Sequence, residues 1–83
     1  MSTAVIEQLR AIWKQALDIE SVPDDANFVD LGGDSLAASM CQQRVAAIFN
    51  VRLQRTALLI EATTLQSVAA RITALIDVNR SRA

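Results

Sequence analysis

The chain has 83 residues, of which 52% are hydrophobic, and its formal net charge at pH 7 is −1. This length and hydrophobic content predict a single small domain over residues 1–83 and exclude a disordered chain. The near-neutral charge excludes the basic surface of a nucleic-acid-binding protein, and no apolar run reaches the roughly 20 residues of a membrane span.

Two residue types limit the chemistry that the chain could perform. It contains no histidine, which excludes a Ser–His–Asp or Cys–His catalytic arrangement. Its single cysteine, Cys41, cannot make an internal disulfide or a metal cluster, as is typical of a protein from the reducing cytoplasm. The amino-terminal residues lack the continuous apolar run of a signal peptide. We therefore expect a cytoplasmic protein with no catalytic residues and no metal site.

An amphipathic helix is predicted over about residues 3–17. Its apolar residues recur at three- and four-residue steps and would form one face: Ile6, Leu9, Ile12, Trp13, Ala16 and Leu17. Ser2 or Thr3 can cap the first turn. We interpret Trp13 as an anchor of the core, with a contact to a partner as the alternative.

A long loop follows over residues 18–33. Turn-forming residues and Pro23 interrupt the helical pattern. A loop of this length in so small a domain is typical of a segment that is functional or that packs through its own side chains. Four apolar residues are expected to hold it to the core, Phe28 most deeply: Val22, Phe28, Val29 and Leu31. Three acids lack the spacing of a calcium loop and are interpreted as solvated turn or capping residues: Asp24, Asp25 and Asp30.

The sequence Asp30-Leu31-Gly32-Gly33-Asp34-Ser35-Leu36 joins this loop to a second helix, predicted over Ser35 to Phe49. The two glycines allow backbone angles that are closed to other residues, and Asp34 can accept the unpaired N–H groups of the first helical turn. Ser35 would then lie at or near the first helical position with its hydroxyl facing outward. Since the chain has no histidine, a base that activates Ser35 would have to come from another protein.

The second helix has two distinct faces. Its core face is expected to carry four apolar residues: Ala38, Cys41, Val45 and either Ile48 or Phe49. Cys41 is therefore interpreted as a small core residue and not as a reactive thiol. The other face carries five residues: Leu36, Ser39, Met40, Gln43 and Ala47. Leu36 and Met40 could fill gaps between helices or could form a docking surface for several partners, and the spacing favours neither.

After the second helix the sequence predicts a connector and a short helix. Asn50 tolerates the left-handed conformation that ends many helices, and residues 51–53 alternate as in an extended segment. Residues 57–61 could make one or two helical turns. Their three consecutive large apolar residues exceed what one face can bury, so Leu59 or Ile60 is expected near the surface beside the serine.

The last predicted helix starts after a cap at Thr63 or Thr64 and runs to about Asp77. An apolar stripe at helical spacing supports it: Leu65, Val68, Ala69, Ile72, Leu75 and Ile76. Residues from Asn79 onward are expected to form a flexible tail. The predicted fold class is all-α, a small bundle of three main helices plus one short helix, with a long loop between helices 1 and 2.

The segment from Phe28 to Leu36, placed between a loop and a helix in a chain of this size, resembles the carrier proteins of thiotemplate biosynthesis. Their pattern has Leu-Gly, a variable residue and then Asp-Ser-Leu, and its serine carries a 4′-phosphopantetheine arm. Helix order, the long first loop and the short third helix match as well. The resemblance implies that Ser35 is the attachment residue for an arm derived from coenzyme A. It also implies that the modifying transferase recognises Asp34 and Leu36.

The function that this resemblance implies is that of a non-catalytic carrier, itself the substrate of a phosphopantetheinyl transferase. It would hold amino-acyl or acyl groups as thioesters and deliver them to partner enzymes in nonribosomal peptide synthesis. The other expected partners are an adenylating enzyme and condensation or tailoring enzymes, with no nucleic acid or membrane and with a monomeric carrier. The expected docking residues are Leu36, Ser39, Met40, Gln43, Leu59 and Ile60.

Two features favour the peptidyl branch of these carriers. The second helix contains Arg44 but no acid, unlike the acid-rich helix of fatty-acid-type carriers, and Gly33 precedes Asp34. The start at Met1 is interpreted as that of a free-standing carrier, with a domain excised from a larger synthetase as the alternative. Residues 54–64 lack the prolines common in peptidyl carriers, a departure that bears on the local geometry of the short helix and on the partners, and not on the attachment site. The alternatives are a polyketide-type acyl carrier and a helical interaction module in which the serine stays unmodified.

Overall fold

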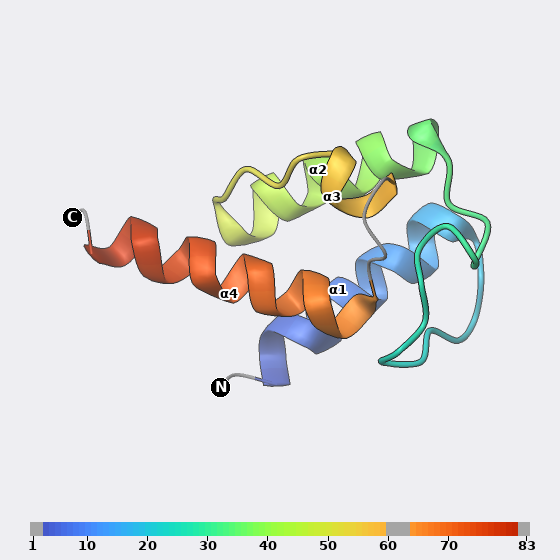
Figure 1. Ribbon diagram of the computed structural model, residues 1–83, viewed down its shortest axis with the longest axis horizontal. Helices are drawn as coiled ribbons and strands as arrows, with labels where there is room; N and C mark the ends of the chain where they lie inside the picture. The colour runs from blue at the N-terminus through green and yellow to red at the C-terminus, as the bar shows by residue number, and fades with distance from the viewer. Residues whose placement is uncertain (1–2, 60–63, 82–83) are drawn as a thin grey trace.

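The computed structural model describes residues 3–59 and 64–81, which contain four α-helices (Figure 1). They are α1 (Thr3–Leu17), α2 (Ser35–Phe49), α3 (Thr56–Leu59) and α4 (Leu65–Ser81). The predicted all-α bundle, with its long loop between the first two helices, is confirmed. None of the described helices has the length and apolar content of a membrane-spanning helix.

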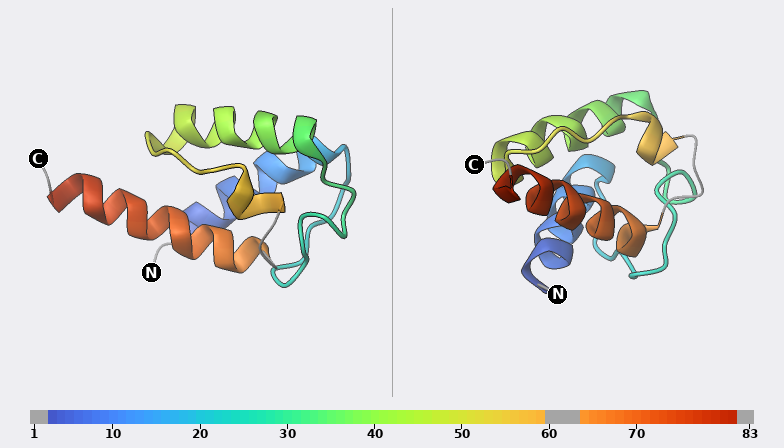
Figure 2. Two further views of the ribbon diagram at one scale, coloured as in Figure 1. Left: turned by 45° about the horizontal axis from the view of Figure 1, so that its top comes forward. Right: turned by 60° about the vertical axis from the view of Figure 1, so that its left-hand side comes forward.

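The core lies around α1, which packs against both α2 and α4, while α3 packs against α2 (Figure 2). All four helices and both long connections contribute large, fully buried side chains: Leu9, Trp13, Phe28, Cys41, Val45, Leu53, Leu58, Leu65, Val68 and Ile72. Burying one large apolar side chain contributes about 1.5–3 kcal/mol. A bundle of this size therefore depends on the loop residues as well as on its helices.

Two aromatic rings form the centre of this core. Trp13 on α1 and Phe28 in the loop are both fully buried, with ring centroids 5.0 Å apart and an interplanar angle of 69°. This edge-to-face arrangement places the positive edge of one ring against the negative face of the other. The predictions that Trp13 anchors the core and that Phe28 enters it deeply are both confirmed.

The other predicted core residues of the loop and of α2 are confirmed in part. Val22 and Cys41 are buried and Leu31 is half-buried. The prediction for Val29 is wrong, since this side chain is 45% exposed: it follows the inward-facing Phe28 in a tight turn and faces solvent. Ile48 is exposed, and Phe49, the other candidate for the core face, packs against the core.

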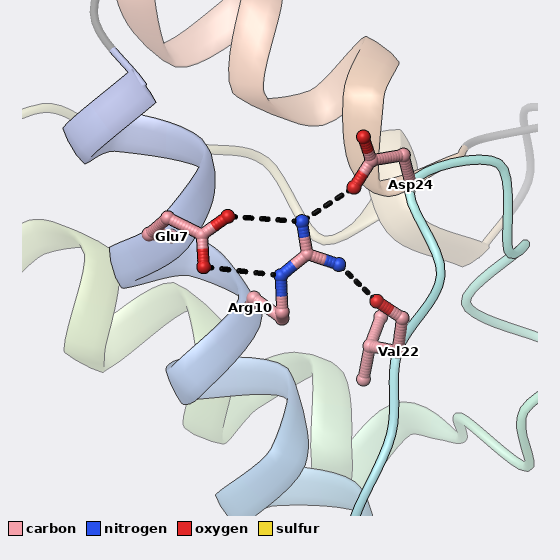
Figure 3. Close-up of polar contacts among 4 residues, drawn as sticks. All are labelled: Glu7, Arg10, Val22 and Asp24. Carbon is pink, nitrogen blue, oxygen red and sulfur yellow. Dashed lines mark hydrogen bonds and ion pairs between the residues drawn. The ribbon is translucent and has the colours of Figure 1, made fainter.

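Arg10 on α1 holds the first part of the loop in place (Figure 3). Its guanidinium donates hydrogen bonds to the Val22 carbonyl and to the Asp24 carboxylate, and it pairs with Glu7 Oε2 at 3.1 Å. The hydrogen bonds with Asp24 and then Glu7 raise the pKa of Arg10 further, so the guanidinium stays charged. Asp24 is therefore an ion-pair partner and not only a solvated turn residue, because α1 brings a cation beside it.

The same loop supplies acceptors for the start of α4. The N–H groups of Leu65 and Gln66 donate to the carbonyls of Ala26 (3.1 Å) and Asp24 (3.0 Å). Such N–H groups at a helix start have no partner within the helix. Thr64 forms an isolated bridge with Asn27. The loop thus forms hydrogen bonds with both α1 and α4.

Thr64 caps α4, which confirms one of the two alternatives predicted for this cap. Thr64 Oγ1 accepts from Ser67 N at 3.1 Å, and Ser67 Oγ accepts from Thr64 N at 2.9 Å. These reciprocal bonds satisfy two N–H groups at the helix start, as in a capping box. The other candidate, Thr63, lies outside the described residues, as does the candidate cap Ser2 of α1.

The predicted end of α4 near Asp77 is wrong, because the helix continues to Ser81. Asn79 and Arg80, expected in a tail, are helical, and Asn79 Nδ2 donates to the Asn50 carbonyl at 3.1 Å. This contact lies between the ends of two helices, which a local pattern does not show. Asn50 ends α2 in the predicted left-handed conformation (φ 57°, ψ 41°).

The connector and the short helix follow the predicted pattern. Val51 and Leu53 are buried and Arg52 is exposed, which confirms the alternation expected for an extended segment. The short helix covers Thr56–Leu59. The last two residues of its predicted range, 60 and 61, lie outside the described part of the chain.

Replacing Arg10 with methionine should loosen the loop while keeping an apolar stem. The lost hydrogen bond to the Val22 carbonyl lowers the free energy of unfolding by about 1 kcal/mol, and the exposed ion pairs add less than about 1 kcal/mol. Urea unfolding measures this loss. Glu7→Gln is the matched control, because it leaves both loop contacts of Arg10 in place. Equal losses in the two variants would contradict this role of Arg10.

Candidate functional site

A closed turn over residues 27–33 carries the chain from the core to the start of α2. Three backbone hydrogen bonds close it: Leu31 N to Asn27 O (3.1 Å), Gly32 N to Val29 O (3.0 Å) and Gly33 N to Phe28 O (3.0 Å). The side-chain oxygen of Asn27 also accepts from Val29 N at 3.0 Å. These internal hydrogen bonds fix the conformation of the turn, and they therefore fix the direction in which the chain leaves it.

The two glycines of this turn are needed for different reasons. Gly32 has a φ of +97°, which favours glycine over residues with a side chain. Gly33 has no positive φ, but a Cβ on it would lie 2.3 Å from Phe28 Cδ2 and Cε2. The predicted conformational freedom thus applies to Gly32, whereas Gly33 is required for space.

Asp34 caps α2, as its position in the sequence predicts. It is extended (φ −126°, ψ −173°), and its Oδ1 accepts a hydrogen bond from Ala37 N at 2.9 Å. Such a cap contributes about 1 kcal/mol to the stability of the helix. Ser35 is therefore the first residue of α2, and its side chain is exposed.

The surroundings of Ser35 fit a phosphate ester on its hydroxyl. Within the described residues Ser35 Oγ makes no hydrogen bond. The unpaired N–H groups and the positive dipole end of a helix start favour an attached anion. No group of three or more potential metal ligands occurs in residues 3–59 and 64–81. The serine is thus accessible for modification but has no histidine in the chain that could activate it.

The predicted docking residues within the described part of the chain lie mostly at the surface. Leu36 is 71% exposed and Met40 is 40% exposed, so neither is a gap filler between helices. Gln43 is exposed, Ser39 and Leu59 are half-buried, and Ile60 lies outside the described residues. Arg44 is the one charged residue of α2. The face of α2 that carries Leu36, Met40 and Gln43 is therefore uncharged and partly apolar, and its use in docking stays a prediction.

Cys41 does not contribute a reactive thiol to this site. Its side chain is fully buried in the core face of α2, as predicted, and burial raises the pKa of the thiol to about 12. A protonated thiol is a poor nucleophile. Any thioester chemistry of this domain therefore needs a thiol that is added to it.

Two residues that hold the loop and the start of α2 in place were not predicted from the sequence. Arg10 was not singled out, since its spacing from Glu7 predicts only a contact along one helix. Ala37, which supplies the N–H to the cap and is itself buried, was not assigned to the core face either. An N-cap acceptor bonds an N–H two or three residues into the helix, so Ala37 could have been inferred from Asp34.

Comparison with protein families gives one match over most of the chain. Residues 7–72 match the family described as "Phosphopantetheine attachment site". This range contains the turn, the cap and Ser35, together with most of the core.

Curated relatives include parts of much larger proteins. The chain is 37% identical over 71 residues to part of a linear gramicidin synthase protein of Brevibacillus parabrevis, a match that covers 86% of this chain but 1% of that protein. A shorter match is 60% identical over 30 residues to part of a phenolphthiocerol/phthiocerol polyketide synthase protein of Mycobacterium tuberculosis. It covers 36% of this chain and 2% of that protein.

A solved structure has a similar fold. It is the A-PCP didomain of the carboxylic acid reductase of Segniliparus rugosus in complex with AMP, with a TM-score of 0.79 and 35% identity. The match covers 84% of this chain and 10% of that chain.

The raised pKa of Cys41 predicts an unreactive thiol in the native, unmodified chain. A thiol-specific reagent at mildly alkaline pH should label the urea-unfolded chain once and the native chain hardly at all. The unfolded thiol has the ordinary pKa of 9.0 and loses its proton first. Stability should therefore fall as the pH rises from 9.0 towards about 12, and less so in Cys41→Ala. Labelling of the native chain as fast as of the unfolded chain would contradict this.

Proposed function

This chain belongs to the family of phosphopantetheine attachment domains, and we propose that Ser35 is the residue that carries the covalent arm. Domains of this family are non-catalytic carriers, and 4′-phosphopantetheine is their covalent cofactor. The observation that carries the assignment is the exposed hydroxyl of Ser35 at the first position of α2. The cap formed by Asp34 and the turn closed by Gly33 support it.

In the proposed attachment, the domain is a substrate of a phosphopantetheinyl transferase. Ser35 Oγ bonds to the phosphorus next to the pantetheine of coenzyme A, and the bond to the leaving 3′,5′-adenosine bisphosphate breaks. The proton of the hydroxyl passes to a base of the transferase. The start of α2 then stabilises the negative charge of the new phosphodiester with its N–H groups.

Once attached, the arm supplies a terminal thiol that can hold an acyl group as a thioester. The chain's own task is to present this group, and the surface formed by Leu36, Met40 and Gln43 is proposed to contact the enzymes that load and unload it. Because these three residues carry no charge and Arg44 is the one charged residue of α2, we expect apolar contacts to dominate docking. Tethering keeps the cargo at a high effective concentration near each enzyme.

We place the carrier in nonribosomal peptide synthesis, as a monomeric cytoplasmic domain loaded by an adenylating enzyme and unloaded by condensation or tailoring enzymes. The resemblance to a peptide synthetase over 86% of the chain supports this pathway, and the fold of the A-PCP didomain supports the adenylating partner. The 60% identity over 30 residues to a polyketide synthase protein favours a second candidate, a polyketide acyl carrier. Loading by an adenylating enzyme or by an acyltransferase distinguishes the two.

Ser35→Ala should fold like the parent and accept no arm. The experiment incubates both chains with coenzyme A, Mg²⁺ and a broad-specificity transferase and measures their intact masses. The parent should gain one phosphopantetheine on the peptide that contains Ser35. Because the Ser35 side chain makes no contact that holds the fold, the circular dichroism of the variant should not change. Modification of Ser35→Ala at another residue would refute the assignment.

Met40→Glu should leave the modification largely intact and impair at least one downstream enzyme. The new charge would have to be desolvated in an apolar contact, and a lost contact worth about 1.4 kcal/mol lowers kcat/KM about tenfold. Val78→Glu is the matched control, since Val78 is an exposed apolar residue on α4. Unchanged transfer rates with every cognate enzyme would exclude Met40 from docking.

A further inference from the structure

Phe28 has a fixed place in the molecule although it lies in a loop. Its ring is fully buried and meets Trp13 edge to face at 5.0 Å. Trp13 in turn belongs to α1, which packs against α2 and α4. The ring therefore cannot shift unless the centre of the core opens.

The backbone of Gly33 lies directly on this ring. A Cβ at position 33 would lie 2.3 Å from Phe28 Cδ2 and Cε2 and 2.7 Å from the Phe28 carbonyl oxygen. Gly33 N also donates to that oxygen at 3.0 Å. At the neighbouring Gly32 a Cβ would meet no atom within 4 Å. The close approach is thus specific to Gly33, two residues before Ser35.

Little backbone freedom remains between Gly33 and the hydroxyl of Ser35. The backbone of Asp34 is extended, and its carboxylate accepts a hydrogen bond from Ala37 N, so this residue is held between the turn and α2. The side chain of Ser35 is exposed and has no hydrogen bond within the described residues. Its location is therefore set by the backbone of Gly33 and Asp34 before it and of α2 after it, since no hydrogen bond of its own side chain holds it.

We infer that Phe28 is a positioning residue for attachment at Ser35, which it places through Gly33. The inference rests on the proposed function of Ser35. The base that removes the hydroxyl proton comes from the transferase, so the place of Ser35 Oγ must match a second protein. A misplacement of about 1 Å can cost about 100-fold in rate. A shift of Gly33 into space vacated by a smaller side chain at position 28 would therefore slow attachment.

The experiment compares transferase kinetics of the whole domain and of Phe28→Leu, with coenzyme A as donor. Because Leu36 and Met40 keep their places on α2, KM for the carrier should change little, whereas kcat should fall about tenfold or more. Ile72→Val is the control for stability alone, since Ile72 is fully buried on α4 and lies outside the turn and the start of α2. Urea unfolding sets a temperature at which all chains are folded.

A double-mutant cycle shows whether the effect passes through Gly33. Gly33→Ala should lower kcat in the parent chain. In the Phe28→Leu background the same change should cost less, because part of the colliding ring is gone. The fluorescence of Trp13, the single tryptophan, should change in Phe28→Leu and reports the altered ring contact independently of activity.

The outcomes separate this inference from the proposed function. An unchanged kcat in Phe28→Leu, or an equal loss in Ile72→Val, overturns the positioning role while the parent is still modified at Ser35. Additive effects of Phe28→Leu and Gly33→Ala overturn the route through Gly33. Failure of the parent chain to accept the arm at Ser35 overturns the proposed function itself, and the inference with it.

Discussion

The burial of Phe28 against Trp13 is the contact on which the rest of this small domain depends. The indole N–H of Trp13 is buried without a hydrogen-bond partner among the described residues, and an unpaired buried donor costs about 1–3 kcal/mol. The free energy that favours burial of Trp13 must therefore come from the packing of its ring, which the contact with Phe28 completes. One aromatic contact thereby joins the first helix to the loop at the centre of the core.

That loop serves as a structural element in its own right. One of its carbonyls accepts a hydrogen bond from the guanidinium of Arg10, and others accept from N–H groups at the start of α4. The loop ends in the cap of α2. The contacts at the starts of α2 and α4 satisfy N–H groups that have no partner within their own helix. A segment without regular structure thus connects the three main helices.

Much of this architecture could be predicted from local patterns. The bounds of α1 and α2, the cap at Asp34, the depth of Phe28 and the exposure of Ser35 all follow from helical spacing and from residues with a known place at helix ends. What could not be predicted depends on contacts between distant parts of the chain. Arg10 meets Asp24 only after folding, and α4 continues past Asp77 beside the end of α2.

Two further details show the same limit. Val29 matched the apolar pattern of the loop, yet it faces solvent, whereas Phe28 before it is fully buried and Leu31 after it packs against the core. Gly33 was predicted to be needed for its backbone angles, whereas it is needed because the ring of Phe28 occupies the place of a side chain.

The burial of Cys41 has a consequence for the cargo of such a carrier. A thioester held on a tether is exposed to every nucleophile of the protein that carries it, and an accessible thiol nearby would capture the acyl group by exchange. Here the one cysteine is protonated inside the core, and the chain has a single lysine, Lys14, which is half-buried on α1. The domain's own thiol is therefore kept from the acyl group that the arm carries, so exchange with this thiol does not release it before an enzyme accepts it.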